Sequence, residues 1–349
     1  MIVRRDVSVA APRLFGACLL LLSAGGLLFA PAAAGAGATA PAPTGCRVVA
    51  PSVPTCGRWW GEALDPGDQS LISAVGAASA AADRRLDIVH TYHVWNDAFP
   101  TVEETQLAHE GHLLMIGWKP ITSAGRPVSW ASIAAGDEDR TIRAEGQRLR
   151  ALGEPVLLSF SYEPERLVGI TGTASQFAAA FRHVHDVIVK AGGTNVEWAW
   201  TVMGLNDSYW HRTYPQLWPG GQYVDWISWD PYNWAACRKE TWRSFAAMVR
   251  PFYQWVTAQD FGSLPLMLSE YGTVEDPHDP GRKASWFSGE AHALGQFPRL
   301  RALVYFNLPS PPASCDWRST TSSASQAAFR SLADSPSFRP TARLQPTTP

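Results

Sequence analysis

Eight short apolar or aromatic runs recur along the chain, each with the length typical of a buried strand. They lie at residues 58–61, 86–92, 113–118, 155–160, 196–201, 224–229, 264–269 and 300–306. Segments with helical spacing separate several of them, at residues 137–152, 173–191, 241–259 and 281–294. Because strand and helix alternate and eight strands can close a barrel, the pattern predicts an α/β fold, a (β/α)8 TIM barrel, with residues 57–334 as a single domain.

The alternation breaks between the fifth and sixth runs. Residues 203–223 are rich in Asn, Trp, Pro and Gly, which predicts a long loop there. Residues 37–56 are interpreted as an N-terminal lead-in to the barrel. Residues 335–349 are rich in Pro, Thr and Ser, which predicts a flexible C-terminal tail.

The N-terminal segment has the order of a secretory signal peptide. Arginines between positions 4 and 13 precede an apolar run at 14–30, which passes into small residues at 31–40. A membrane anchor is the alternative, but a run of about 17 residues is at the lower limit for a bilayer span. We therefore expect residues 1–36 to be a signal peptide, the protein to be secreted and extracellular, and no membrane span to remain after cleavage.

Four further cysteines follow that segment, at Cys46, Cys56, Cys237 and Cys315. An even number in a chain bound for an oxidising compartment is typical of disulfides. Three pairings are possible, and the cost of loop closure favours Cys46 with Cys56, which leaves Cys237 with Cys315. Neither pair has the close spacing of a zinc site, so we expect no bound metal.

Composition narrows the possible partners. With 46% hydrophobic and 17% charged residues, the chain can bury a sizeable core. A net charge of −2 without a run of Lys or Arg offers little to neutralise phosphates, so nucleic acid is not an expected partner. All 16 tryptophans lie from Trp59 onward, a density that is compatible with sugar binding. We expect a monomer that needs no cofactor.

Two glutamates follow strand-like runs that would lie on opposite sides of a barrel mouth. Glu163 comes after the fourth run and Glu270 after the seventh, where a TIM barrel places its active site. A glycosidase needs two carboxyl groups beside the glycosidic bond, about 5–5.5 Å apart for retention of configuration and about 9 Å for inversion. Glu165 lies two residues beyond Glu163, and we expect it to be a supporting or exposed charge.

Motifs around these runs resemble a known family. They are Tyr162-Glu-Pro-Glu165, Glu197-Trp-Ala-Trp200, residues 219–233 (PGGQYVDWISWDPYN), Ser269-Glu-Tyr-Gly272 and residues 302–307 (ALVYFN). Their order is similar to that in glycoside hydrolase family 26, the β-mannanase family of clan A, and the similarity runs from about residue 59 to residue 332. The resemblance implies a TIM-barrel glycoside hydrolase.

The resemblance also implies roles for single residues. Glu163 would be the acid/base and Glu270 the nucleophile, with Tyr232 as a hydrogen-bonding neighbour of the nucleophile. Trp118 would contact sugar. One position departs from the family, since Tyr162 stands where a histidine usually precedes the acid/base. We expect Tyr162 to bind substrate at the 2-hydroxyl of the sugar; the departure leaves both carboxylates intact but makes the prediction of mannose as the preferred sugar less secure.

Other polar and aromatic residues near the expected mouth are candidates for the cleft. His93 and Trp95 follow the second run, and Asn307 follows the eighth. Trp234 could stack on a sugar ring, or it could belong to a packed loop beside Cys237. Further tryptophans at run ends or in the long segment, Trp60, Trp210 and Trp218, would extend an open cleft.

The sequence therefore predicts a secreted, retaining endo-β-1,4-mannanase-like enzyme whose partner is a neutral polysaccharide. A β-glucanase or xylanase on the same scaffold is one alternative. A carbohydrate-binding barrel without turnover is another, which the two glutamates argue against.

Overall fold

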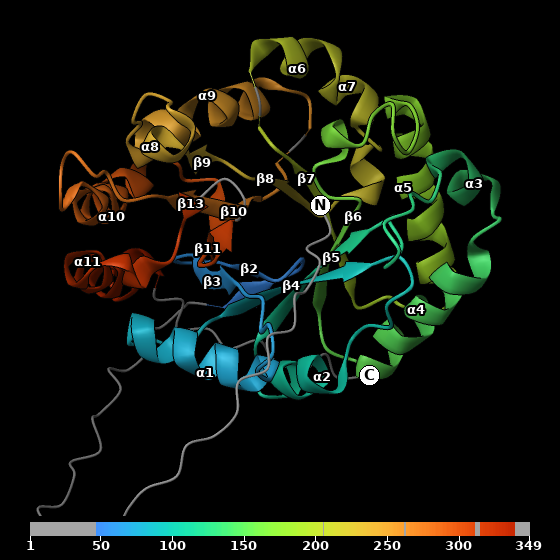
Figure 1. Cartoon of the computed structure of the whole chain (residues 1–349). Helices are drawn as coiled ribbons and strands as arrows, with labels where there is room; N and C mark the ends of the chain where they lie inside the picture. Colours follow the sequence, from blue (N-terminus) through green and yellow to red (C-terminus); the bar gives the residue numbers. More distant parts are fainter. Residues whose placement is uncertain (1–46, 205, 262, 311–314, 339–349) are drawn as a thin grey trace, which may run out of the picture. The chain divides into compact units, whose positions relative to one another are not determined.

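The computed structural model describes residues 47–204, 206–261, 263–310 and 315–338. Its centre is a ring of strands: β3 (Trp59–Ala63), β4 (Ile88–Val94), β5 (Leu113–Lys119), β6 (Val156–Phe160), β7 (Val196–Val202), β8 (Trp226–Trp229), β10 (Leu266–Thr273) and β11 (Leu300–Phe306). Neighbours in the ring are parallel, and β11 pairs with both β10 and β3, which closes it (Figure 1). The predicted TIM barrel is confirmed.

Helices surround the barrel in Figure 1. The longer ones are α1 (Leu71–Ala82), α2 (Val102–His109), α4 (Asp139–Leu152), α5 (Ala174–Lys190), α9 (Phe245–Ala258), α10 (Arg282–Ala293) and α11 (Ser323–Ala333). Short ones are α3 (Trp130–Ala135) and α8 (Ala235–Arg238). The four predicted helices correspond to α4, α5, α9 and α10. Local chemistry sets their starts: Thr173 and Gln176 form a capping box at the beginning of α5.

Side chains of the strands alternate between two apolar layers. Those facing the barrel axis form one cluster, which includes Trp59, Met115 and Trp226. The alternate positions, such as Trp60 and Ile116, pack with the helices in a second cluster. Because the side-chain period of a strand is two, this parity decides which residues at the strand ends can reach the barrel mouth.

The segment predicted as a loop between β7 and β8 contains helices. These are α6 (Asp207–Arg212), α7 (Tyr214–Leu217) and the 3-10 turn η2 (Gly221–Tyr223). The Asn206 side chain accepts a hydrogen bond from the backbone N–H of Ser208, and Pro215 lies in the first turn of α7. Asn and Pro begin helices here, which is why a loop-like composition gave the wrong prediction.

Both predicted boundary segments contain packed structure. In the lead-in, β1 (Val48–Val49) pairs antiparallel with β2 (Val53–Pro54), and Ser52 Oγ donates to Glu197 Oε1 at 2.6 Å. In the tail, the 3-10 turn η5 (Pro336–Phe338) buries Phe338, whose ring centroid lies 4.9 Å from that of Trp60. The predicted flexible tail therefore begins too early at residue 335. The predicted signal peptide and residues 339–349 lie outside the described residues.

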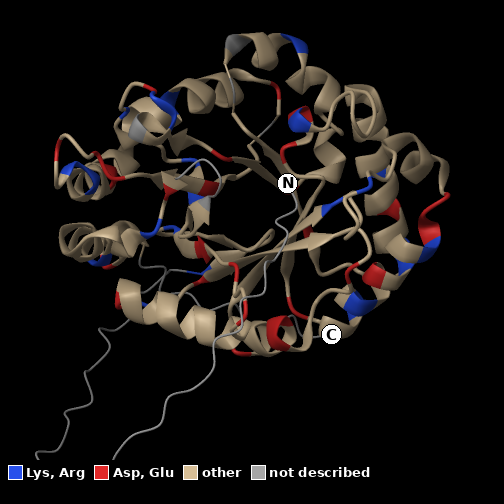
Figure 2. Ribbon diagram, viewed as in Figure 1, with Lys and Arg blue, Asp and Glu red and all other residues tan. Residues whose placement is uncertain are grey.

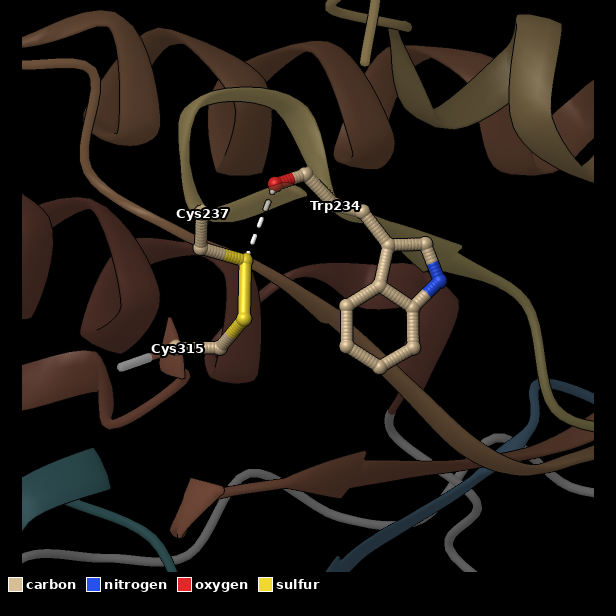
Figure 3. The surroundings of a disulfide bond; sticks show 3 residues. All are labelled: Trp234, Cys237 and Cys315. Carbon is tan, nitrogen blue, oxygen red and sulfur yellow. Dashed lines mark hydrogen bonds between the residues drawn. A yellow bond between two sulfur atoms is a disulfide. The ribbon is translucent and has the colours of Figure 1, made fainter. Parts of the chain in front are cut away.

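A disulfide joins Cys237 of α8 to Cys315 of β13 (Cys315–Asp316), as the sequence predicts, with 5.3 Å between the Cα atoms (Figure 3). Sγ of Cys237 also lies 3.0 Å from the carbonyl oxygen of Trp234. This is a close contact and not a hydrogen bond, because a disulfide sulfur has no hydrogen to donate. Cys56 is disulfide-bonded as well, while Cys46, its predicted partner, lies outside the described residues.

Acidic and basic residues are interspersed around the ring of helices in Figure 2. Acidic positions also occur on the strands and loops inside that ring. Within the described ranges, none of the helices has both the length and the apolar character needed to cross a membrane.

Candidate active site

Glu270 lies near the carboxyl end of β10, at an irregularity of the strand. The pairing of β10 with β11 shifts register between Leu268 and Tyr271, so that both Ser269 and Glu270 turn into the barrel. A regular strand would send one of the two outward. The bulge therefore delivers the carboxylate to the mouth while Ser269 stays in the barrel interior.

Two phenols hold the Glu270 carboxylate. Tyr92 at the end of β4 donates to Oε1 at 2.7 Å, and Tyr232 of β9 (Tyr232–Asn233) donates to Oε2 at 2.6 Å. Burial and the charge of Glu270 raise the pKa of both tyrosines, which keeps them protonated as donors. The Tyr232 contact is the one that the family resemblance implies. Tyr92 is a site residue that the sequence analysis missed.

A buried aspartate supports the same strand from below. Oδ1 of Asp230, which follows β8, accepts hydrogen bonds from Ser269 Oγ at 2.5 Å and from the backbone N–H of Glu270 at 2.9 Å. Burial, followed by the charges of Glu270 and Glu163, raises the pKa of Asp230 well above its usual range. Asp230 thus fixes the backbone of Glu270.

Glu163 lies in a tight turn that begins after Phe160, the last residue of β6. Its φ of 50° lies in the left-handed region, where a side chain is strained, and its backbone N–H donates to the carbonyl of Thr201 on β7 at 3.1 Å. The turn leads into η1 (Pro164–Arg166) and keeps Glu163 at the mouth instead of further along the loop. Its Oε2 lies 3.4 Å from Nη1 of Arg166, whose side chain is 60% exposed, so that ion pair is screened by solvent.

The two glutamates share one electrostatic environment. Burial first, and then the charge of Glu163, raise the pKa of Glu270 to about 7, while the hydrogen bonds from Tyr232 and Tyr92 and the charge of Lys119 act in the opposite direction. A like charge has this effect only at short range in a poorly solvated site. Glu163 follows β6 and Glu270 lies near the end of β10, so the closed ring places both at the carboxyl-end mouth, although they are over a hundred positions apart in the sequence.

Lys119, the last residue of β5, adds a cation to the mouth. Its Nζ lies 4.0 Å from the centroid of the Tyr162 ring, within the range of a cation–π interaction. Burial lowers the pKa of Lys119, while the charges of Glu163 and Glu270 raise it. The sequence analysis missed this residue because a strand-end lysine has no distinctive motif.

Gly117 makes room for the aromatic wall beside this cation. Tyr162 packs against Tyr92 with 5.6 Å between the ring centroids. A Cβ atom on Gly117 would lie 3.1 Å from Cδ1 of Tyr92 and 3.1 Å from Cε1 of Tyr162. Both tyrosines therefore depend on the missing side chain for their positions.

The structure does not bring His93, Trp95 or Trp118 to the mouth. His93 lies on the helix side of β4, with 2.8 Å between its Nε2 and Oε1 of Glu104. Trp118 is fully buried and stacks on Trp95 with 4.4 Å between the centroids. The predictions of cleft roles for these three residues are wrong, because strand parity turns Tyr92, Gly117 and Lys119 inward instead.

Two other predicted cleft residues have partners within the protein. The guanidinium carbon of Arg238 lies 3.2 Å from the centroid of the Trp234 ring, and the disulfide is next to it, which favours the packed-loop interpretation of Trp234. Asn307 donates to Glu62 Oε2 at 2.6 Å and accepts from the backbone N–H of Ser319 at 2.7 Å. Its amide mainly ties β3 and β11 to the following segment.

The additional tryptophans serve packing. Trp60 is fully buried between barrel and helices. Trp210 stacks on Trp255 with 6.2 Å between the centroids, and Trp218 lies 4.4 Å from Phe261. These contacts hold the helical segment after β7 on the barrel, so the indole content mostly builds the core.

Glu165 is buried, so of the two predictions only the supporting role fits. Oε1 accepts hydrogen bonds from the backbone N–H of Met203 at 2.7 Å and from the Tyr214 hydroxyl at 2.8 Å. Burial raises its pKa to about 7. It joins the loop after β6 to the helical segment after β7. Among the described residues, no group of His, Cys, Asp and Glu side chains is arranged to hold a metal ion.

Comparison with known proteins gives one sequence relative and many solved structures. The chain is 28% identical over 292 residues to endoglucanase H of Acetivibrio thermocellus. The match covers 79% of this chain and 30% of that enzyme, so the chain spans less than a third of the curated relative's length. No family model matches the chain.

The solved structures match the fold. A family 26 β-mannanase from Bacteroides ovatus aligns with a TM-score of 0.56 at 14% identity, over 81% of this chain and 90% of that one. The catalytic domain of a family 26 endo-β-1,4-mannanase from Bacillus sp. JAMB-750 also aligns with a TM-score of 0.56, at 15% identity, over 82% and 87%. These matches support the fold that the resemblance to glycoside hydrolase family 26 implies: this barrel is similar in fold to family 26 β-mannanases and in sequence to an endoglucanase.

Proposed function

We propose that the protein is a secreted, retaining glycoside hydrolase that cleaves internal β-glycosidic bonds of a neutral polysaccharide. The observation that carries the proposal is the clamp on Glu270, in which two phenols donate to its two carboxylate oxygens while Glu163 acts on it from the other side of the mouth. A carboxylate held by donors on both oxygens is fixed in orientation as well as in charge.

In this mechanism Glu270 attacks the anomeric carbon while Glu163 gives its proton to the departing glycosidic oxygen. The C–O bond to the leaving sugar breaks, and a covalent glycosyl–Glu270 ester forms. Glu163, now a carboxylate, takes a proton from water as that water attacks the same carbon and releases Glu270. Two inversions give net retention, and no redox partner is needed.

The proposed substrate is a β-1,4-mannan. Solved structures similar in fold include β-mannanases, which supports mannan. The sequence relative is an endoglucanase, which favours β-glucan, and Tyr162 in place of the histidine usual in the family permits β-glucan or xylan. Release of reducing ends from mannan, β-glucan and xylan, measured side by side, separates these substrates. Activity on β-glucan or xylan together with no activity on mannan would overturn the mannanase assignment.

Two variants test whether the barrel is a catalyst at all. Glu163→Ala and Glu270→Ala should each lose most hydrolysis while keeping the circular dichroism of the wild type. Proton NMR of the first product should show the β-anomer, as retention requires. Hydrolysis unchanged in both variants would overturn the catalytic assignment, and an initial α-anomer would replace retention by inversion.

The proposed export to the extracellular space rests on the signal-like order of residues 1–36, and the Cys237–Cys315 disulfide is compatible with an oxidising compartment. Expression of the full chain in a secreting host should yield a mature protein in the medium. N-terminal sequencing should place its start between residues 34 and 41. Size-exclusion chromatography with light scattering tests the expected monomer.

A further inference from the structure

Three buried acidic side chains and one half-buried lysine meet at the mouth. The acidic residues are Glu163, Glu270 and Asp230, and the cation beside them is Lys119. Arg166 also faces Glu163, but its exposed side chain places its charge in solvent. Because interactions between charges grow as water is excluded, the less exposed ammonium of Lys119 acts on the carboxylates more strongly than the guanidinium of Arg166 does.

A chain of contacts through two tyrosine rings connects Lys119 to Glu270. Its ammonium lies over the Tyr162 ring, Tyr162 packs on Tyr92, and Tyr92 donates to Glu270. No ion pair within 4 Å binds Lys119 to a single carboxylate among the described residues. A cation–π contact with the Tyr162 ring leaves the ammonium charged and able to act on the nearby carboxylates.

We propose that Lys119 is the counter-charge of the carboxylate pair in both steps of the reaction. The proposal rests on the proposed function. The first step starts from the form in which Glu163 holds the proton that it donates and Glu270 carries the negative charge. In the glycosyl-enzyme Glu270 is a neutral ester and Glu163 carries the charge. One ammonium beside the pair compensates whichever group is ionised, so the net charge of the three groups is zero in both forms. Lys119 is a positioning residue that acts through the carboxylates.

The test compares Lys119→Met, Lys119→Gln and Lys119→Arg with wild type. The readout is the pH dependence of kcat/KM for a 2,4-dinitrophenyl β-glycoside of the disaccharide that wild type releases. Without the positive charge, Glu270 holds its proton more tightly, and so does the neighbouring Asp230. The acidic limb should therefore move upward by about one pH unit in the Met and Gln variants. The Arg variant should keep the wild-type limb.

A matched control is Lys190→Met at the exposed end of α5, which should leave the profile unchanged. An acidic limb that stays in place in both neutral variants, or that moves equally in the Arg variant, would overturn the role of Lys119. If one neutral variant fails to fold, the other and the Arg variant still decide. Failure of the proposed function is recognised separately, since wild type would then hydrolyse none of the polysaccharides or Glu270→Ala would stay active.

Discussion

Tyr92 donates a hydrogen bond of 2.7 Å to Oε1 of Glu270, although β11 and β3 lie between their strands in the barrel. The bond crosses the mouth and uses an oxygen that Tyr232 leaves open. The sequence alone does not reveal this pairing, since the two residues are 178 positions apart. The contact links the proposed chemistry to barrel closure, because only a closed ring brings β4 to β10.

Removing the Tyr92 hydroxyl should slow the reaction without unfolding the barrel. A hydrogen bond to a charged group contributes about 1.5–3 kcal/mol, so Tyr92→Phe should lower kcat/KM by roughly 10- to 100-fold. Loss of the donor also raises the pKa of Glu270, which should move the acidic limb of the pH profile upward. Tyr209→Phe on α6, a half-buried tyrosine whose ring packs on Tyr214, is the control. Wild-type kinetics in Tyr92→Phe would contradict the clamp.

Removing the charge of Glu163 should lower the pKa of Glu270, the opposite of the effect expected for Tyr92→Phe. Burial and Glu163 raise the pKa of Glu270 to about 7. In Glu163→Ala the second cause disappears, so the pKa of Glu270 falls and the acidic limb should move to lower pH. A 2,4-dinitrophenyl β-glycoside, whose leaving group needs no proton, makes this limb measurable. An upward shift, or none, would show that the two carboxylates are not coupled.

Filling the space at Gly117 should disturb both tyrosines together. The Cβ atom of Gly117→Ala would press on the rings of Tyr92 and Tyr162, and overpacking costs about 1–3 kcal/mol. We expect a lower unfolding midpoint in urea and a lower kcat. Gly289→Ala on α10, where nothing lies within 4 Å of an added Cβ, should instead be stabilising by roughly 0.5–1 kcal/mol. Equal midpoints for the two variants would exclude the packing role.

The buried Glu62 on β3 should make the free energy of unfolding depend on pH. Burial raises its pKa to about 8, although the hydrogen bond from Asn307 opposes this. The pKa of Glu62 in the folded state lies above the unfolded value of about 4.3, so between these pH values the folded state binds more protons than the unfolded state. The contribution of Glu62 to stability therefore falls as the pH rises. Glu62→Gln cannot ionise and should lose about 1.4 kcal/mol less per pH unit in that window.

Urea titrations of wild type and Glu62→Gln at pH 5 and pH 8 measure this difference. Glutamine keeps an oxygen for the Asn307 amide, so the variant preserves the local hydrogen bond. Glu240→Gln, at an exposed position, is the control and should retain the wild-type slope. Parallel slopes for wild type and Glu62→Gln would show that Glu62 ionises freely in the folded protein.

The sequence by itself determines the barrel and the two glutamates. Eight apolar runs alternate with amphipathic segments, and this periodicity depends on local chemistry that can be read residue by residue. Glu163 and Glu270 could be found because strand ends are easy to locate and a TIM barrel gathers its carboxyl ends at one mouth. The Cys237–Cys315 pairing followed from elimination among a few cysteines.

Only the tertiary structure decides which side chains face the mouth. The period of two in β4 and β5 is visible in the sequence, but its phase is not, and a shift of one residue exchanges Tyr92 for His93 and Lys119 for Trp118. The bulge in β10 breaks that period altogether at Ser269 and Glu270. Phase and bulge are set by register with neighbouring strands, a long-range property, and so the tyrosine clamp and its cation emerge only when the ring closes.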